Sequence, residues 1–451
     1  MIYARDIVKL CEGKIIGSED IILNNFIIDS RKVKENDTYI AIVGEVNDGN
    51  KYAKDALEKG AKAVIISNTN YLDINKYPDK TIIVVEDTLK CLQGLAKYKR
   101  SLYQGKVIAI TGSVGKTSTK DMVSGLLSSK YKVHKTIGNM NNHIGLPLTI
   151  LSLNDEEILV VEMGMNHFGE ISTLTNIAKP NVAIITNIGT AHIGNLGSRE
   201  NILKAKLEIL EGLDKNGVLI INNDNDLLHE YKEKTNNKVI TIGIKNSSDY
   251  MASDIEEDIT SSSFIVNNKD KVVLPLGGRA SIYNYLVGYA VCDYLGVKDK
   301  IKGLDNLELS QNRLEIKNSK LGYTIIDDSY NASYDSVKNA LDLIGKSSKR
   351  KIAVLGDILE LDNYSEDIHR SIAKIVIDNN INKLFLIGNM AKYIGIEAIK
   401  LGFNQDNICY FTKESDSYQT IEKELKKDDI VLFKASHGMQ LNNIVDYLMK
   451  K

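Results

Sequence analysis

The sequence predicts an α/β protein of three domains. Short apolar runs alternate with amphipathic segments along nearly the whole chain, which is typical of βα units that build parallel sheets. These runs fall into three blocks, and a chain of 451 residues is long for one hydrophobic core. We therefore expect three α/β domains, with boundaries near residues 85–100 and near residue 312.

The first block contains an apolar run at 38–43, a helical pattern at 52–59 and a second apolar run at 63–67. A polar stretch at 68–80 follows, and a helical pattern at 89–103 is expected to connect the first two domains. The remaining predicted strands lie at 107–110, 158–162, 182–186 and 218–221 in the second block, and at 323–326, 352–355, 384–387 and 430–433 in the third.

Composition narrows the class of protein. Hydrophobic residues make up 43% and charged residues 26% of the chain, as in ordinary globular proteins. The formal net charge of -2 favours neither nucleic acid nor an anionic membrane as a partner. The four cysteines lack zinc or disulfide-scaffold spacing, so we expect free thiols. The N-terminus does not resemble a signal peptide and no apolar run is long enough to cross a membrane, so we expect a cytoplasmic protein without membrane insertion.

A phosphate-binding loop follows the predicted strand at 107–110. The segment 111–118 (TGSVGKTS) leads into a helical pattern, and its glycines let backbone N–H groups curl around phosphate oxygens at a helix N-terminus. Lys116 is expected to reach the β- and γ-phosphates, and the Thr117 hydroxyl to bind Mg²⁺. The motif is shortened, because Ile110 stands where the general pattern has glycine. The predicted nucleotide-binding residues are Gly112, Ser113, Val114, Gly115, Lys116, Thr117 and Ser118.

Glu162 and His192 come at the ends of the next two strands of this block. A carboxylate at the C-terminal end of a strand beside the phosphate loop is well placed to hold Mg²⁺, directly or through water. His192 lies on a glycine-bearing loop after the strand at 182–186, where a metal or phosphate contact competes with a purely structural role. Its expected position at the same sheet edge favours the functional role.

Two lysines in the helical segment 200–213 have opposite expected environments. Lys206 falls within the apolar stripe of this helix, whereas Lys204 falls on the other face, where it is expected to pair with Glu208. A lysine on an apolar face either extends its ammonium group to water or is desolvated and reactive. A desolvated amine can combine with CO₂ to form a carbamate, which is a metal ligand. The pattern alone favours the first of these two explanations.

Taken together, these segments resemble the Mur ligase family, and the resemblance covers essentially the whole chain. The stretches that carry it are TGSVGKTSTK at 111–120, GNMNNHIGLPLT at 138–149, EMGMNHFGEI at 162–171, ITNIGTAHIGNLGS at 185–198, IIDDSYNAS at 325–333 and AVLGDILELDNYSEDIHR at 353–370. Within the family, EMGMN and LGDILEL are typical of the member that adds D-alanyl-D-alanine.

The resemblance implies an ATP-dependent ligase that joins D-alanyl-D-alanine to UDP-N-acetylmuramoyl-tripeptide through an acyl phosphate in peptidoglycan precursor synthesis. ADP and phosphate would be released. It implies a UDP-substrate-binding domain at 1–85, a central ATP-binding domain at 86–312 and a Rossmann-like C-terminal domain at 313–451. ATP and Mg²⁺ at two sites are the implied cofactors, and a monomer is expected.

The family's functional positions fall on definite residues of this chain. The implied catalytic residues are Lys116, Glu162, His192 and Lys206, and the implied metal ligands are Thr117, Glu162, His192 and Lys206, with Lys206 carbamoylated. The implied nucleotide contacts outside the phosphate loop are Asn284, Arg313 and Asp328. The implied substrate contacts are Ser30, Arg31, Asp48, Gly49, Asn142 and Asn331.

Three segments depart from the family pattern. The family's GRHN segment reads Gly-Arg-Ala280-Ser281 here, its YNANPDS segment has Tyr334 in place of proline, and its KGSRGM segment has His437 in place of arginine. These changes affect the predicted adenine pocket and the C-terminal domain. Lys116, Thr117, Glu162, His192 and Lys206 are all retained.

Three alternative functions stay open at this point. One is a Mur-like ligase with another acceptor, such as an enzyme of the folylpolyglutamate-synthase type, and the EMGMN and Asp29-Ser30-Arg31 segments argue against it. The second is a nucleotide-dependent binding module without ligase activity. The third is an inactive relative that serves as a scaffold. The second does not need the residues around Lys206, and loss of any of the five retained residues would have supported the third.

Overall fold

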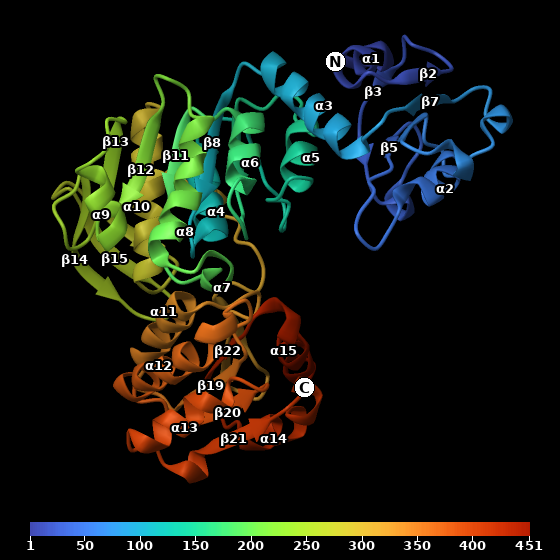
Figure 1. Ribbon diagram of the computed structural model, residues 1–451. Helices are drawn as coiled ribbons and strands as arrows, with labels where there is room; N and C mark the ends of the chain where they lie inside the picture. Colours follow the sequence, from blue (N-terminus) through green and yellow to red (C-terminus); the bar gives the residue numbers. More distant parts are fainter.

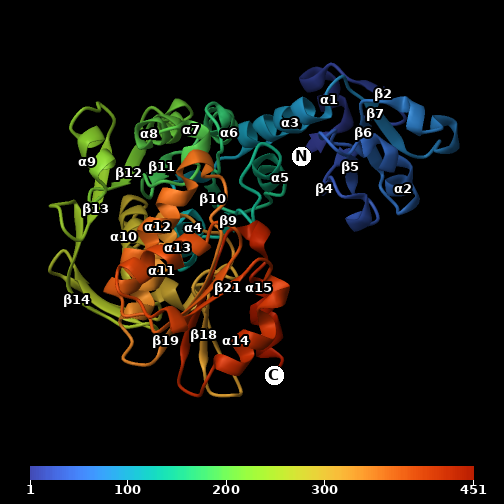
Figure 2. The same ribbon diagram turned by 60° about the horizontal axis from the view of Figure 1, so that its bottom comes forward.

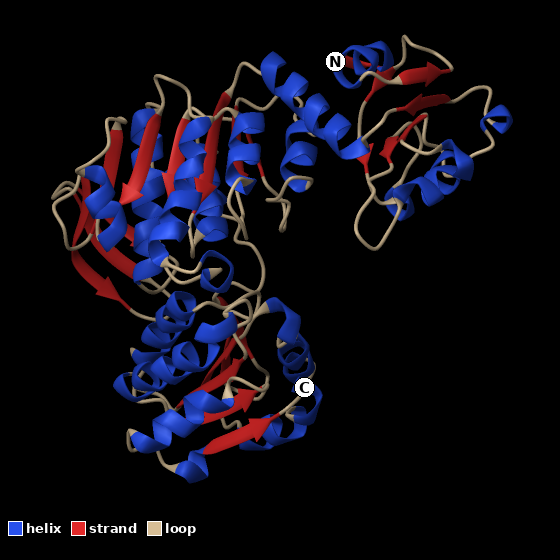
Figure 3. Cartoon of the chain, in the orientation of Figure 1, coloured by secondary structure: helices blue, strands red, loops and turns tan.

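Three larger β-sheets organise the chain, and each lies in its own domain (Figure 1). The computed structural model describes residues 1–451. The predicted α/β architecture with three domains is confirmed. The domains follow one another along the chain, with the N-terminal domain set apart from the other two and the C-terminal domain packed against the central one (Figures 1 and 3).

The N-terminal domain holds a five-stranded sheet in which all strands except β2 run parallel. In spatial order the strands are β2 (Lys14–Ile16), β7 (Thr81–Val84), β6 (Ala63–Ile66), β5 (Thr38–Ile40) and β4 (Phe26–Ile27). A short antiparallel pair, β1 (Ile2–Tyr3) and β3 (Ile22–Leu23), and the helices α1 (Ala4–Cys11) and α2 (Ala53–Glu58) complete the domain.

The central domain holds a nine-stranded sheet. In spatial order its strands are β16 (Asp270–Leu274), β15 (Ser262–Val266), β14 (Tyr250–Glu257), β13 (Val239–Gly243), β12 (Val218–Asn222), β11 (Val182–Ile185), β8 (Lys106–Thr111), β10 (Ile158–Glu162) and β9 (Val133–Lys135). Its helices are α4 (Lys116–Leu127), α5 (Gly145–Leu151), α6 (Glu170–Ala178), α7 (Ile193–Leu196), α8 (Arg199–Leu207), α9 (Asp226–Lys232) and α10 (Arg279–Tyr294).

Strands β8 to β13 pair in parallel, and the apolar residues of β8, β10, β11 and β12 are buried, as is usual in a parallel sheet covered on both faces. Helices α4 and α10 pack against each other and form a hydrophobic core with one face of the sheet. Helices α5, α6 and α8 contribute to the core on the other face of the sheet. Strands β14 to β16 extend the sheet as antiparallel hairpins.

The C-terminal domain holds a six-stranded sheet that is parallel except for its first strand. In spatial order the strands are β17 (Glu315–Asn318), β18 (Thr324–Asp327), β22 (Ile430–Lys434), β19 (Lys351–Gly356), β20 (Lys383–Ile387) and β21 (Ile408–Phe411). Its helices are α11 (Tyr334–Gly345), α12 (Ser365–Asp378), α13 (Lys392–Lys400), α14 (Tyr418–Glu424) and α15 (Asn442–Met449).

Helix α3 (Thr88–Leu102) connects the first two domains, close to the predicted helix at 89–103. It packs against α1 at one side and against α5 and α6 at the other. At its start the Thr88 hydroxyl donates a hydrogen bond to the carbonyl of Ala41 over 2.8 Å. The view in Figure 2 shows α3 bridging the gap between the N-terminal domain and the rest of the molecule. None of the helices has the length and apolar character that crossing a membrane requires.

Candidate active site

The candidate site lies at the carboxyl edge of the central sheet. Strand β8 pairs in parallel with β10 on one side and with β11 on the other. The loops that follow these three strands therefore leave the same edge of the sheet, where ligands of open α/β sheets bind. This topology brings together the phosphate loop, Glu162 and the loop at 186–192, as the sequence predicted.

The phosphate loop has the backbone of an anion site. Gly112, with φ of 148°, passes so close to Thr186 that a Cβ atom would lie 1.9 Å from its hydroxyl oxygen, and Gly115 has φ of 85°. The backbone N–H groups from Gly115 to Ser118, at the start of α4, donate to no acceptor in the chain. These free donors at a helix N-terminus fit a phosphate group.

Lys116 folds back along this loop, where its Nζ donates to the carbonyl of Gly112 over 2.8 Å. Burial lowers its pKa, and the nearby Arg313 adds to this effect, whereas the negative charge of Glu162 opposes it. Two other loop residues are tied to the segment after β11. The Val114 N–H donates to Asn187 Oδ1 over 2.9 Å, and the Ser113 hydroxyl accepts from the Gly189 N–H over 2.9 Å.

Glu162 is 3% exposed, and both its carboxylate oxygens accept hydrogen bonds. Thr117 Oγ1 donates to Oε2 over 2.8 Å, and Asn141 Nδ2 donates to Oε1 over 2.8 Å. The charge of Glu162 raises the pKa of Lys116 against the larger effect of burial. A buried carboxylate that pairs with no lysine or arginine and lies beside a threonine hydroxyl fits a divalent ion. No group of three or more His, Cys, Asp or Glu side chains forms a metal cage, so nucleotide phosphates would have to supply further ligands.

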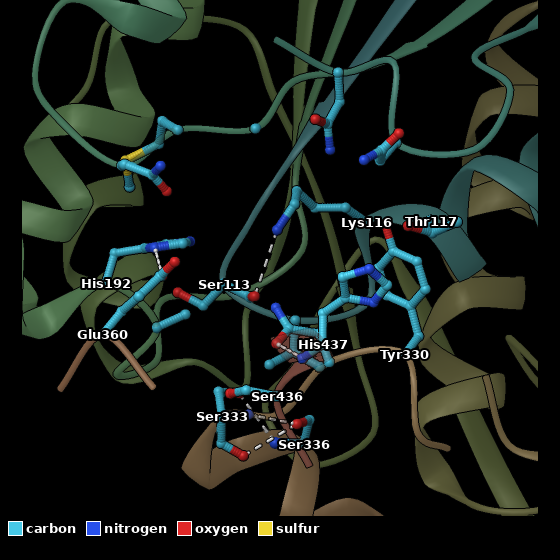
Figure 4. A pocket seen from close by; sticks show the side chains of 18 of the residues that line it. Ser113, Lys116, Thr117, His192, Tyr330, Ser333, Ser336, Glu360, Ser436 and His437 are labelled. Carbon is cyan, nitrogen blue, oxygen red and sulfur yellow. Dashed lines mark hydrogen bonds and ion pairs between the residues drawn. The ribbon is translucent and has the colours of Figure 1, made fainter. Parts of the chain in front are cut away.

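His192 lines the same site but has a different partner. Its backbone is left-handed, with φ of 63°, and its Nδ1 lies 2.7 Å from Oε2 of Glu360 in the C-terminal domain. The two groups meet without the alignment of a hydrogen bond, since Nδ1 has no partner with hydrogen-bond geometry. The neighbouring imidazole lowers the pKa of the Glu360 carboxyl. The close-up in Figure 4 shows this pair on one side of the cavity, with Lys116 and Thr117 on the other.

Lys206 is 1% exposed, which excludes the prediction from the pattern alone that its ammonium extends to water. No hydrogen bond or ion pair holds its amine, and burial together with the charge of Lys116 lowers its pKa well below the usual value. Lys204, two residues earlier on the other face, is exposed as predicted.

The predicted pairing of Lys204 with Glu208 is wrong. The predicted helix at 200–213 ends at Leu207, and a short 3₁₀ turn, Glu208–Glu211, follows it. The Glu208 carboxylate accepts from the N–H groups of Gly169 and Ser172, at 2.8 and 3.1 Å. It therefore caps the N-terminus of α6, where unpaired N–H donors attract a carboxylate more strongly than an exposed lysine does.

The other residues that are predicted to contact the nucleotide lie near the domain boundary, where each contacts another side chain. Asn284 on α10 accepts a hydrogen bond from Thr119 Oγ1 over 2.8 Å, on the helix that begins at the phosphate loop. The Arg313 guanidinium lies 4.2 Å from the ring centre of Tyr330. Asp328 pairs with Lys434, and burial raises the pKa of its carboxyl despite this cation.

A cavity of about 490 Å³ lies between the central and C-terminal domains. The predicted site residues that line it are Ser113, Val114, Gly115, Lys116, Thr117, Asn142, Glu162, His192, Arg313 and Asn331. The predicted residues that do not line it are Gly112, Ser118, Lys206, Asn284 and Asp328, together with the four from the N-terminal domain. Two of the lining residues also support the backbone locally. Asn142 Oδ1 accepts from the Gly145 N–H at the start of α5, and Asn331 Oδ1 accepts from the Ala332 N–H.

The four predicted residues of the N-terminal domain lie at turns in that domain. Ser30 is buried, and Arg31, whose side chain is 85% exposed, pairs with Asp29 and lowers the pKa of that carboxyl to about 2. Asp48 accepts from the N–H and the side-chain amide of Asn50. A Cβ atom on Gly49 would lie 2.6 Å from the carbonyl oxygen of Ile42, so the close turn requires glycine.

Three residues of the site were not predicted from the sequence. Asn141, beside the predicted Asn142, is the amide that binds Glu162, and the GNMNNHIGLPLT stretch was the only signal for it. Asp335 accepts from the Thr190 N–H over 3.0 Å across the domain boundary. Glu360 lies in the LGDILEL stretch, which indicated importance but no particular contact.

Comparisons with known proteins agree with this geometry. Residues 110–292 match the Mur ligase middle domain, residues 312–437 match the Mur ligase glutamate ligase domain, and residues 24–100 match the Mur ligase family catalytic domain. Two curated relatives are named UDP-N-acetylmuramoyl-tripeptide–D-alanyl-D-alanine ligase. The one from Bacillus subtilis is 36% identical over 99% of this chain and 98% of its own length, and the one from Escherichia coli is 31% identical over 85% of each chain.

Solved structures show the same likeness. MurF from Acinetobacter baumannii superposes with a TM-score of 0.88 at 28% identity, covering 100% of this chain and 99% of its own. The MurF ligase from Thermotoga maritima, solved in complex with ADP, has a TM-score of 0.82 at 28% identity and covers 95% of this chain and 97% of its own. With its three domains in the same order and the phosphate loop, Glu162 and Lys206 in place, the chain belongs to the Mur ligase family.

Proposed function

We propose that this protein joins D-alanyl-D-alanine to UDP-N-acetylmuramoyl-tripeptide, with conversion of ATP to ADP and phosphate. The observation that carries the proposal is the hydrogen bond of Thr117 to the buried Glu162 beside the phosphate loop, in the wall of a cavity between two domains. Full-length relatives that bear the name of this ligase support the same reaction.

A carboxylate is a poor electrophile, so it has to be activated before an amine can attack it. The terminal carboxylate of the tripeptide attacks the γ-phosphorus of ATP, so that ADP leaves and an acyl phosphate forms. The amine of the dipeptide then attacks the acyl carbon, loses a proton and expels phosphate. Lys116 and the free N–H groups of the phosphate loop neutralise charge on the transferred phosphoryl group. Walls from two domains exclude water, which would otherwise hydrolyse the acyl phosphate.

Magnesium is part of this proposal. Thr117 and Glu162 would hold one ion together with nucleotide oxygens, and the ion would neutralise phosphate charge when bound. The amine of Lys206 is buried and unpaired, and its lowered pKa leaves more of it neutral. Attack of this neutral amine on CO₂, with loss of a proton, would give a carbamate. With His192, that anion would serve a second metal site.

The N-terminal domain is proposed to hold the uridine diphosphate end of the substrate through Ser30, Arg31, Asp48 and Gly49. We assign this role to residues 1–85, the ATP-binding role to 86–312 and the closing, Rossmann-like role to 313–451. One chain supplies every residue of the cavity, which supports a monomer as the active unit. Dependence on ATP and on nucleotide-linked precursors supports a cytoplasmic location.

Phosphate release from ATP, measured with UDP-N-acetylmuramoyl-tripeptide in the presence and absence of D-alanyl-D-alanine, tests this function. Release should require both substrates and a divalent ion, and mass spectrometry should detect the pentapeptide product. Turnover with glutamate in place of the dipeptide would instead identify a ligase with another acceptor. Nucleotide-dependent binding without product would identify a module without ligase activity.

A further inference from the structure

The segment 358–361, which follows β19, forms part of the cavity wall and carries a carboxylate that the proposed reaction has not used. All four of its residues line the cavity, and the side chain of Glu360 is 53% exposed. The other two carboxylates that line the cavity, Glu162 and Glu170, belong to the central domain. Glu360 is therefore the only lining carboxylate that the C-terminal domain contributes.

Two buried groups fix the backbone of this segment. His369 on α12 is fully buried, and its Nε2 accepts from the Ile358 N–H over 3.0 Å, while Nδ1 contacts the carbonyl oxygen of Ser365 at 2.6 Å. This pair of contacts requires the neutral ring with its proton on Nδ1. On the next residue, the Leu359 N–H donates to Ser436 Oγ over 2.9 Å.

Glu360 itself has a left-handed backbone, with φ of 64°. Residues other than glycine adopt this conformation at a cost, which is met where the surrounding structure holds them in place. Here the tethers at Ile358 and Leu359 immediately precede the strained residue, and its side chain extends towards His192, as Figure 4 shows. The tethers therefore fix the backbone that carries the carboxylate, which contacts His192 in the cavity wall and stays half-exposed.

The charge of Glu360 is only partly compensated. Its Oε2 lies 2.7 Å from His192, but no lysine or arginine pairs with it, and its Oε1 has no partner in the chain. Beside it, the half-exposed Leu359 offers an apolar contact, and its Cδ1 lies 3.2 Å from where a Cβ atom of Gly438 would be. The segment thus presents an anion next to a small apolar surface.

We infer that Glu360 binds the ammonium group of the acceptor dipeptide, with His369 and Ser436 as its positioning residues. The inference rests on the proposed ligase function. The acceptor amine has to arrive beside the acyl phosphate, and Glu360 lies next to His192 at the side of the cavity that faces Lys116. An ammonium group brings three N–H donors, which suit the free Oε1, and the methyl group of the first alanine suits Leu359.

Substitution Glu360→Gln keeps the size of the side chain and removes its charge. We expect the KM for D-alanyl-D-alanine to rise about 10- to 100-fold, with the KM values for ATP and the UDP-linked substrate within about twofold of the wild type. The matched control is Glu366→Gln, which removes a carboxylate that pairs with Arg370 on α12 and does not line the cavity. It should leave all three KM values unchanged.

A dipeptide analogue with hydroxyl in place of the amine separates charge recognition from packing. As a competitive inhibitor it should bind the wild type and Glu360→Gln equally well. Two results would overturn the inference. If Glu360→Gln weakened the binding of the dipeptide and of the analogue equally, Glu360 would act by packing. If it lowered kcat and left the KM for the dipeptide unchanged, Glu360 would act through His192. His369→Leu should raise the same KM, and His369→Gln, which retains an acceptor for the Ile358 N–H, should restore part of the affinity.

The wild type is first assayed against a panel of amino acids and dipeptides. If it uses a different amine, the proposed function fails, but Glu360→Gln must still raise the KM for that amine. An unchanged KM for whichever amine the wild type uses would overturn the role of Glu360 while leaving the ligase reaction intact.

Discussion

The central domain is predicted to hold ATP and the N-terminal domain the uridine diphosphate part of the substrate, yet the two sites differ in completeness. In the central domain, Thr117 and Asn141 already bind Glu162 from two different loops. In the N-terminal domain, Asp48 bonds only to nearby Asn50, and Arg31 is largely exposed. We infer that one sheet edge preforms the phosphoryl-transfer site, and we expect the proposed uridine site to depend on the substrate and on how the domains come together.

The largest effect should come from the preformed site. Lys116→Ala removes the cation beside the phosphate loop, and phosphate release should fall roughly 10³-fold or more, because no other lysine bonds to that loop. The circular dichroism spectrum should stay unchanged. Turnover near the wild-type rate in a folded variant would show that the phosphate loop does not bind the transferred phosphoryl group.

Lys206 and Lys204 make a matched pair on one helix. Lys206→Ala should lower activity about 10²-fold, because it removes the proposed anionic metal ligand, and acetate should restore part of the activity. Lys204→Ala should change activity less than twofold, since its side chain is exposed and unpaired. Intact-mass analysis under CO₂ should detect the carbamate on the wild type only. Equal losses in the two variants would contradict the assignment of the helix faces.

A smaller, selective effect is expected in the N-terminal domain. Arg31→Ala should raise the KM for the UDP-linked substrate about tenfold, as loss of one charged hydrogen bond does, and leave the KM for ATP unchanged. Lys51→Ala, which removes an exposed cation of the same domain, is the control. A parallel rise in both KM values for Arg31→Ala would indicate a general change in the fold instead of uridine recognition.

The smallest expected signal is a change of shape. Small-angle scattering should show a modest decrease in the radius of gyration when ATP analogue and UDP-linked substrate are both present, because their binding draws three domains together. Each ligand alone should give a smaller decrease in the radius of gyration. An unchanged radius with both ligands at saturation would mean that the separated arrangement in Figure 1 is already the working one.

The sequence predicted the strands at the site well, because β8, β10 and β11 are buried on both faces and read as continuous apolar runs. It missed β14 to β16, since β14 alternates between exposed and more buried residues and pairs in antiparallel hairpins. The helix predicted at 200–213 was too long for a tertiary reason, because Glu208 caps the N-terminus of α6. Asp335 and Glu360 could not be predicted, because each contacts a residue far away in the chain and no local pattern records such a pair.

Oxygen transfer tests the central claim most directly. The UDP-linked tripeptide is prepared with ¹⁸O in its terminal carboxylate and allowed to react with ATP and D-alanyl-D-alanine. If the carboxylate attacks the γ-phosphorus, one of its oxygens must leave with the phosphate, so each amide bond formed should yield one phosphate that carries ¹⁸O. Amide formation with all of the ¹⁸O absent from phosphate would contradict an acyl phosphate and the whole account of the cavity as its site.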